Sequence, residues 1–131
     1  MNITTKNDLI NLLQNTDYSI KSLLTVVATA AEMGNTENFA AVSYTAVEAF
    51  GEWSGFLKDG EMVMRKEGNS AIADRLKAES QKLTSIHADL DSSITDAAAN
   101  NNMGIFINRF GANAENLMKI DQELNNILTA L

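Results

Sequence analysis

The sequence of 131 residues contains neither cysteine nor proline. Without cysteine the chain has no disulfide, no thiol nucleophile and no thiolate ligand for a metal. A chain of average composition and this length would contain about six prolines, and their absence leaves long helices uninterrupted. The two missing residue types exclude a disulfide-stabilised fold and favour a helical one.

Basic residues are also scarce, since ten Lys and Arg stand against seventeen Asp and Glu, which gives a net charge of −7. Residues 1–65 hold four basic and eight acidic side chains and residues 66–131 hold six and nine, so the acidity is spread evenly along the sequence. A negative field repels phosphate backbones and anionic lipid surfaces. We therefore expect no nucleic-acid partner and no membrane attachment.

Long apolar runs are missing as well. The longest runs without charge, residues 22–31 and 97–108, are too short and too polar to cross a bilayer. The beginning, MNITTKNDL, lacks the basic and then apolar arrangement of a secretory signal. Hydrophobic residues nevertheless make up 45% of the chain, which suits one globular domain over residues 1–131. The sequence thus predicts a single-domain cytoplasmic protein.

Glycine and asparagine cluster at residues 34–35, 60, 68–69 and 100–102, where we expect the chain to reverse. Between these points apolar residues recur at steps of three and four, the period of an amphipathic helix. The last segment repeats them every seven residues, at Met103, Phe110, Leu117, Leu124 and Leu131. The expected helices cover residues 5–33, 36–57, 70–97 and 103–131.

Short reversals between long helices make neighbouring helices antiparallel. The predicted fold is therefore all-α, an up-and-down four-helix bundle built from two antiparallel helical hairpins and roughly 38 Å long. Two points stay open. Residues 15–17, Asn-Thr-Asp, could interrupt the first helix because their side chains compete for backbone hydrogen bonds. Residues 60–68 could be helix or loop.

Signatures of catalysis and of cofactor binding are absent, so we expect no cofactor and no metal. The only histidine, His87, lacks the glutamate three residues earlier that a di-metal bundle requires. A single histidine on a helical bundle resembles histidine phosphotransfer domains, which follow it with lysine and glycine. Here Ala88 and Asp89 follow, and carboxylates repel phosphate. We interpret His87 as lying at the edge of an apolar stripe, loosely paired with Asp91.

Residues 53–55, Trp-Ser-Gly, form a W-x-G triplet. The triplet resembles the turn motif of the small helical-hairpin proteins exported by type VII secretion systems. In that family it lies in the reversal between two long helices, whereas the reversals expected here are near Gly34 and Gly60. The match covers three residues, and we assign no family from it.

Two carboxylates interrupt the apolar stripes of the last two helices. Glu79 and Asp121 each lie about 21 residues from the reversal at residues 100–101, so antiparallel packing places them at one level. Thr16 lies at a similar level on the first helix. These three residues form a candidate polar layer, and paired carboxylates in a poorly solvated site can bind cations or exchange protons. Arg75 and Lys82 flank Glu79 at helical spacing and offer a purely structural explanation.

The second helix has few charges, and one side of it presents Tyr44, Val47, Gly51 and Gly55 at steps of three and four. Each glycine costs a helix about 1 kcal/mol relative to alanine, so a compensating close contact is expected there. The contact is either internal or with another molecule. We take the four residues as a candidate partner-binding surface.

The expected function is that of a non-enzymatic helical interaction protein, such as an adaptor, a secretion-type chaperone or an inhibitor. It would act by binding a protein partner, and we expect a homodimer. The alternative is a bundle that binds a small molecule or a cation, with hydrolytic activity as a variant, centred on Glu79 and Asp121.

Overall fold

The structure is a computed structural model that describes all residues 1–131. It is entirely helical, with 84% of the residues in helices and no strand. The prediction of an all-α fold is confirmed, whereas the prediction of four helices is not, because the first expected helix is divided in two. The five helices are α1 (Lys6–Gln14), α2 (Ile20–Glu32), α3 (Thr36–Lys66), α4 (Ser70–Ala99) and α5 (Gly104–Ala130).

The division between α1 and α2 is made by side chains that bind the backbone. Asn15 Oδ1 accepts hydrogen bonds from the amides of Asp17 and Tyr18, and Ser19 Oγ caps α2 by accepting from Ser22 N at 3.1 Å. These local bonds offer the backbone an alternative to helical hydrogen bonding. The interruption left open for residues 15–17 is therefore present.

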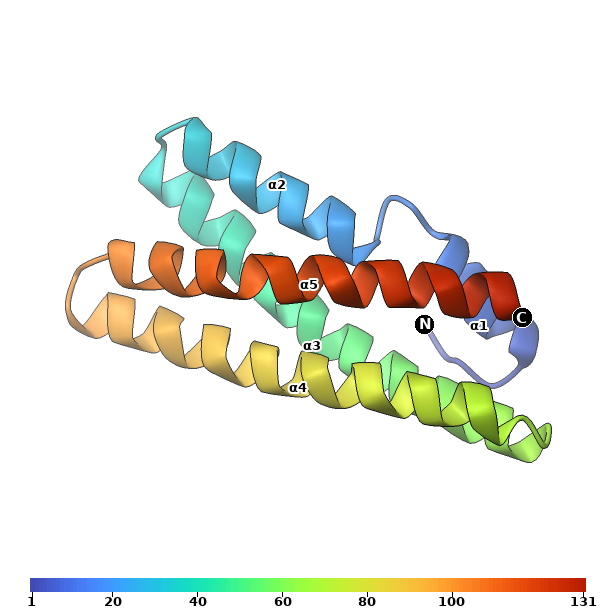
Figure 1. Cartoon of the computed structure of the whole chain (residues 1–131). Helices are drawn as coiled ribbons and strands as arrows, with labels where there is room; N and C mark the ends of the chain where they lie inside the picture. The colour runs from blue at the N-terminus through green and yellow to red at the C-terminus, as the bar shows by residue number, and fades with distance from the viewer.

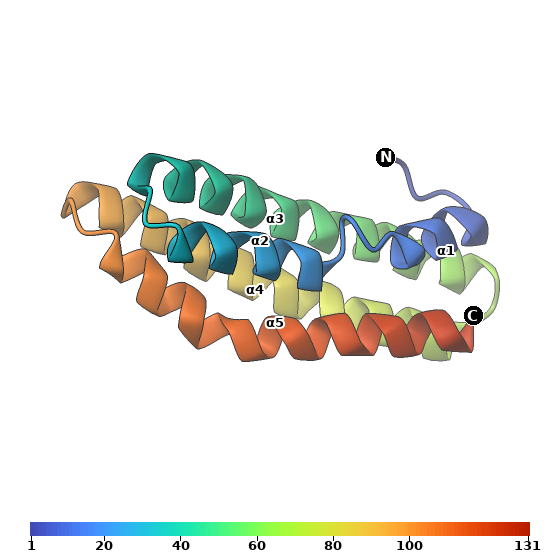
Figure 2. The same cartoon turned by 90° about the horizontal axis from the view of Figure 1, so that it is seen from above.

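The helices form one elongated bundle in which chain neighbours from α2 to α5 run antiparallel (Figure 1). Helix α3 packs on α4 and α4 on α5, while α1 and α2 each contact both α3 and α5. Helices α1 and α2 follow one another along the bundle (Figure 2), on the side that a single long helix was expected to occupy. The α2–α3 and α4–α5 reversals lie together at what we call the distal end. Helix α1, the α3–α4 turn and the C-terminus lie at the opposite, proximal end.

Helix α3 is longer than the sequence suggested. The expected end near residues 58–60 is wrong, because the helix continues through Gly60 to Lys66 and so includes most of the undecided stretch. Gly60 is buried, and a Cβ atom there would lie 3.0 Å from Leu9 Cδ1. The glycine therefore permits α1 to approach α3 and does not end the helix.

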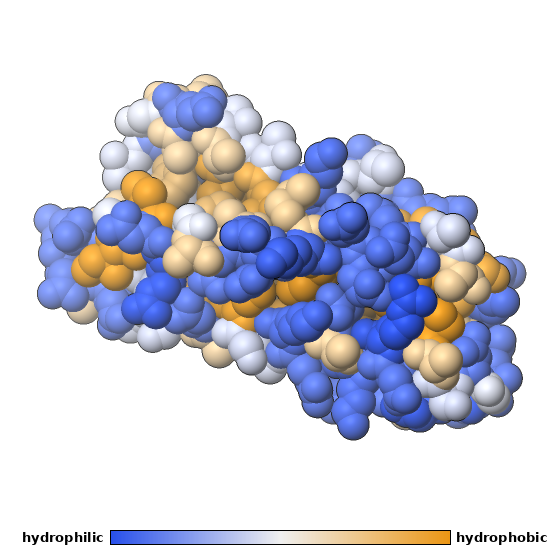
Figure 3. Space-filling view, viewed as in Figure 1, coloured by the Kyte–Doolittle hydropathy of each residue, from blue (hydrophilic) through white to orange (hydrophobic).

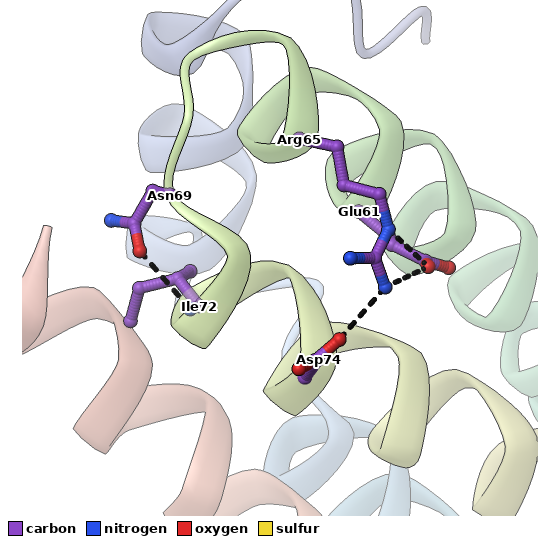
Figure 4. A network of polar contacts seen from close by, with 5 residues as sticks. All are labelled: Glu61, Arg65, Asn69, Ile72 and Asp74. Carbon is purple, nitrogen blue, oxygen red and sulfur yellow. Dashed lines mark hydrogen bonds and ion pairs between the residues drawn. The ribbon is translucent and has the colours of Figure 1, made fainter.

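The reversal between α3 and α4 uses Gly68, whose φ of +78° suits a residue without a side chain. Asn69 then caps α4 by accepting a hydrogen bond from Ile72 N (Figure 4). Beside it, the Arg65 guanidinium binds Glu61 at 2.7 Å and Asp74 at 2.9 Å. Figure 4 shows this bridge joining the end of α3 to the start of α4.

Two aromatic groups anchor the core. Trp53 is 2% exposed, stacks on Tyr18 with ring centroids 5.9 Å apart, and donates from Nε1 to Tyr18 O at 2.9 Å. Trp53 thereby holds the α1–α2 linker against α3. The W-x-G triplet, residues 53–55, lies inside α3 and not in a reversal. Toward the distal end, Phe106 is fully buried between Phe39 and Phe110.

Candidate functional site

The candidate polar layer does not form one site. Glu79 is 3% exposed, and its Oε2 accepts from Lys82 Nζ at 3.0 Å while Oε1 has no partner. Asp121 Oδ1 instead accepts from the backbone amide of Lys21 at 3.1 Å, in the first turn of α2. Thr16 is exposed in the α1–α2 linker. No hydrogen bond or ion pair joins the three residues, and no group of three or more His, Asp or Glu is placed to hold a metal.

The candidate partner-binding surface is divided by the structure. Tyr44 is 52% exposed, and Gly55 is exposed with nothing within 4 Å of a Cβ atom built there. Val47, by contrast, is 2% exposed, and Gly51 packs against α4. Partner binding stays a prediction for the set, in which Tyr44 and Gly55 are exposed, Gly51 is partly exposed and only Val47 is buried.

The contact that Gly51 makes is with the imidazole of His87. A Cβ atom on Gly51 would lie 2.9 Å from His87 Cε1, closer than side-chain carbons pack. The ring is held there by a 2.8 Å hydrogen bond between its Nδ1 and Val47 O. Because a carbonyl oxygen only accepts, Nδ1 carries the proton. The loose pairing of His87 with Asp91 is not found, and His87 is bound to the α3 backbone instead.

Helices α3 and α4 approach closely along the same line. Ser54 Oγ donates to Ser80 O at 3.1 Å, and Ser80 Oγ donates to Ser54 O at 2.8 Å. The hydroxyls of Ser54 and Thr84 are also in contact. Small side chains and reciprocal hydrogen bonds thus join the two helices, and we call their outer, solvent-facing junction the α3/α4 seam.

Two hollows lie along this seam. The first, which we call the acidic groove, has a volume of about 640 Å³ and is lined by Tyr44, Glu48, Gly51, Glu52, Ser54, Thr84, His87 and Asp91. No lysine or arginine lines it. Glu48 and Asp91 form no ion pair, and Glu52 has one long hydrogen bond, 3.4 Å from Tyr18 Oη. The groove therefore presents carboxylates whose charge the chain itself does not neutralise.

The second hollow, which we call the end cleft, continues the seam to the distal end. Its volume is about 370 Å³, and its lining is Thr36, Ala40, Ser43, Tyr44, Ile94, Ala97, Ala98, Asn101, Asn102, Met103 and Phe106. None of these residues is charged, and seven are hydrophobic. Ser43 is 2% exposed and its Oγ has no hydrogen-bond partner. Tyr44 lines both hollows and so separates them.

Charge is divided between the two halves of the bundle. The distal half, residues 22–57 and 83–114, contains a single basic residue, Arg109, against seven acidic ones: Glu32, Glu37, Glu48, Glu52, Asp89, Asp91 and Asp96. The rest of the chain holds nine basic and ten acidic residues. Six of the seven net negative charges thus belong to the half that contains the end cleft and most of the acidic groove.

Tyr18 connects the linker to the rim of the acidic groove. Burial, together with the nearby negative charge of Glu52 and the hydrogen bond between them, raises the pKa of the Tyr18 phenol to about 12. The phenol therefore stays protonated over the whole physiological range, and its hydroxyl donates to the carboxylate.

Other faces of the molecule have a different character. In Figure 3 apolar surface gathers where α2 meets α5 and near the start of α5, while much of α4 and the rest of α5 is hydrophilic. Val26 on α2 and Ile107 on α5 are each about half exposed. A groove between α4 and α5 is lined by charges of both signs, Lys82, Asp89 and Lys119. Only the α3/α4 seam combines an apolar hollow with an acidic one.

None of the helices is both long enough and apolar enough to cross a membrane. Comparison with known proteins gives no match: no protein-family model, no curated protein and no solved structure matches the chain.

Sequence reasoning missed both hollows, although one signal for them was present. The stretches between Lys21 and Lys58 and between Lys82 and Arg109 contain no Lys or Arg at all. When charges are counted over residues 1–65 and 66–131, each stretch is averaged with neighbouring segments that do contain Lys and Arg. When charges are counted over the distal and proximal halves of the folded bundle, the two stretches without Lys or Arg fall together in the distal half.

Proposed function

We propose that the protein is a non-enzymatic interaction module that binds another protein along the α3/α4 seam. The observation that carries this proposal is the position of Tyr44, a half-exposed aromatic side chain between an uncharged cleft and a groove of unneutralised carboxylates. Tyrosine is enriched in protein interfaces because its ring supplies contact area and its hydroxyl a hydrogen bond. An adaptor, a secretion-type chaperone and an inhibitor would all act in this way, by binding another protein.

The arrangement of polar groups supports binding over catalysis. His87 is the only imidazole, and its Nδ1 bonds to the Val47 carbonyl and not to a carboxylate that would stabilise its charged form. No hydrogen bond joins His87 to the hydroxyl of Ser54 or Thr84. The two hydroxyls are instead engaged with Ser80 O and with each other, in bonds that join and support the two helices.

The alternative function centred on Glu79 and Asp121 receives no support from their surroundings. Glu79 binds the side chain of Lys82, and Asp121 binds the first turn of α2. Each carboxylate has a structural partner of its own, so the pair offers no shared site for a cation or for proton exchange.

A homodimer through the four-residue surface is less favourable than a complex with a different protein. A two-fold interface places the same patch of each copy together. Along this seam Glu48, Glu52 and Asp91 would approach their counterparts without a Lys or Arg between them, and like charges in contact are costly. We therefore favour a hetero-complex, with self-association tested by light scattering.

A photo-crosslinking experiment tests the proposed function. The crosslinking amino acid p-benzoylphenylalanine replaces Tyr44 in cells that produce the protein, and, as a matched control, replaces Met62, which is similarly exposed at the proximal end. We expect a discrete crosslinked protein from position 44 and none from position 62. Crosslinks of equal yield from both positions, or from neither, would contradict binding at the seam.

A further inference from the structure

We propose that the seam receives a segment of a partner protein in which an apolar side chain and one or more Lys or Arg lie on the same face, two to three helical turns apart. The apolar side chain occupies the end cleft, and the cations lie in the acidic groove. This inference rests on the proposed function and specifies the chemistry of the partner.

Charge complementarity identifies the cationic part. Glu48, Glu52 and Asp91 line the groove, none of them forms an ion pair, and no Lys or Arg lines it. Six of the fourteen acidic residues outside the groove do have a basic partner within the chain, as Asp89 has in Arg109 at 2.7 Å. The groove carboxylates are therefore available to external cations, and clustered charges of one sign both attract and orient an oppositely charged partner.

The apolar part follows from the end cleft. Its lining carries no charge, and its volume of about 370 Å³ falls within the range that holds a large side chain or a small ligand. Ser43 lines the cleft, and its buried hydroxyl has no partner within the chain. A buried polar group without a hydrogen bond is unfavourable, which marks the cleft as incomplete without an occupant.

The distance between the hollows sets the spacing in the partner. On α3 the cleft is lined from Thr36 to Tyr44 and the groove from Tyr44 to Ser54, so their centres are about nine residues, or about 14 Å, apart along the helix. A helix laid along the seam returns to one face after about 7, 8 and 11 residues. Apolar and basic residues at those separations span the two hollows.

Two other occupants fit less well. A second copy of the chain would bring the same unneutralised carboxylates together, and an anionic lipid surface would face a half that holds seven acids and one base. Both are outcomes that the experiment distinguishes.

The binding test uses alanine-based helical peptides labelled with fluorescein. The probe carries Phe and, about 7, 8 and 11 residues later, three Arg on the same face. One comparison peptide replaces the three Arg with Glu, and a second moves Phe to the opposite face. By fluorescence anisotropy at low salt we expect the probe to bind at least tenfold more tightly than either comparison. Its affinity should fall severalfold as salt is raised.

Two pairs of variants assign the binding to the seam. The triple variant E48Q/E52Q/D91N removes three groove charges, and the control D59N/E67Q/E115Q removes three proximal charges, so both have the same net charge. A98F fills the end cleft from an exposed position on α4, and A78F adds the same ring elsewhere on that helix. We expect the first member of each pair to lose at least tenfold in affinity and the second to change less than twofold. Equal losses within a pair would overturn the inference.

The crosslink from position 44 separates this inference from the proposed function. A crosslinked partner segment with apolar and basic residues at the stated spacing supports both. A segment without Lys or Arg at that spacing overturns the inference and leaves the proposed function standing, as does a peptide probe that binds no better than its Glu counterpart. A crosslink only to a second copy, or to lipid in vesicles of phosphatidylcholine and phosphatidylserine, also overturns the inference.

Discussion

The two ends of the bundle use charge in opposite ways. In the proximal half, the part of the chain outside residues 22–57 and 83–114, acids and bases are nearly equal in number. Five of the six ion pairs lie there, among them Arg65 with Glu61 and Asp74 (Figure 4) and Arg75 with Glu123 at 2.6 Å. At the distal end only Asp89 has a basic partner. Five of the ten acidic residues in the proximal half thus have a basic partner within the fold, whereas six of the seven in the distal half have none.

This difference shows that net charge has to be counted over the fold and not over the sequence. Each half of the sequence contributes one basic-poor stretch, residues 22–57 or 83–108, and a remainder rich in both signs. Antiparallel packing of α2 with α3 and of α4 with α5 brings the two basic-poor stretches to the same end. An evenly acidic sequence becomes a polarised molecule.

The largest effect tests whether the distal end, although differently charged, is equally well packed. Phe106→Ala removes a fully buried ring from between Phe39 and Phe110 and should lower the free energy of unfolding by about 3–5 kcal/mol. Urea denaturation followed by circular dichroism measures the change. The neighbour Ile107, which is half exposed, provides the control, since its replacement by alanine should cost well under 1 kcal/mol. Similar losses from both would show a loosely packed distal end.

Two glycines on α3 should respond with opposite signs. Gly55→Ala meets nothing within 4 Å and should raise the free energy of unfolding by up to about 1 kcal/mol through helix propensity. Gly51→Ala places a methyl group 2.9 Å from a ring held by Val47 O, so it should lower stability by about 1–2 kcal/mol despite the same gain in propensity. Thermal melts of the two variants decide. If both substitutions raised the free energy of unfolding, the His87 ring would have to move away from position 51 at little cost, against the hydrogen bond that holds it to Val47 O.

The stabilising contribution of Tyr18, which lies in the α1–α2 linker between the two ends, should be lost at high pH. The pKa of Tyr18 is raised to about 12 in the folded protein from an ordinary value of 10.0. As pH rises from 10 to 12 the unfolded chain releases this proton first, so the contribution of Tyr18 to stability is complete below pH 10 and is lost toward pH 12. Denaturation curves across this window should show a smaller decline for Tyr18→Phe than for Tyr44→Phe. Equal declines would contradict the shifted pKa.

The smallest effect tests the contrast in charge directly. Neutralising the groove with E48Q/E52Q/D91N should leave stability unchanged or raise it by about 0.5 kcal/mol at low salt, because unneutralised like charges repel. Glu123→Gln, which removes the partner of Arg75, should lower stability by at most about 1 kcal/mol, as is usual for exposed ion pairs. Both differences should shrink at high salt. If E48Q/E52Q/D91N lowered the free energy of unfolding, the three groove carboxylates would be stabilising the folded protein.

Local features of the fold were predictable from the sequence. Thr5 and Asp8, three residues apart as a capping box requires, form one at the start of α1. The three reversals occur at residues 33–35, 67–69 and 100–103, close to the glycine and asparagine clusters. The end of α3 was not predictable. Glycine disfavours a helix when local sequence alone is considered, but here the missing side chain of Gly60 leaves room for Leu9 of α1, and the helix continues. Glycine signals a break only when no neighbour requires its lack of a side chain.

The candidate site was less accessible to sequence reasoning, because its residues acquire their roles from other helices. Helical spacing marks Gly51 as unusual, but its partner, His87, lies 36 residues away on α4. Tyr44 was identified, yet the hollows on either side of it need α4 and α5 for their walls. Periodicity shows which side of a helix is unusual, and packing decides what meets that side.

The hydrogen bond from the Lys21 amide to Asp121 has a consequence for the order in which the chain folds. The cap that completes the first turn of α2 comes from a residue one hundred positions later. During synthesis α2 emerges from the ribosome with only the local Ser19 cap, and α3 and α4 can pair into a hairpin before the missing carboxylate exists. Helix α2 can pack on α3 as soon as α3 is made, but its first turn receives this second cap only when α5 lies alongside it.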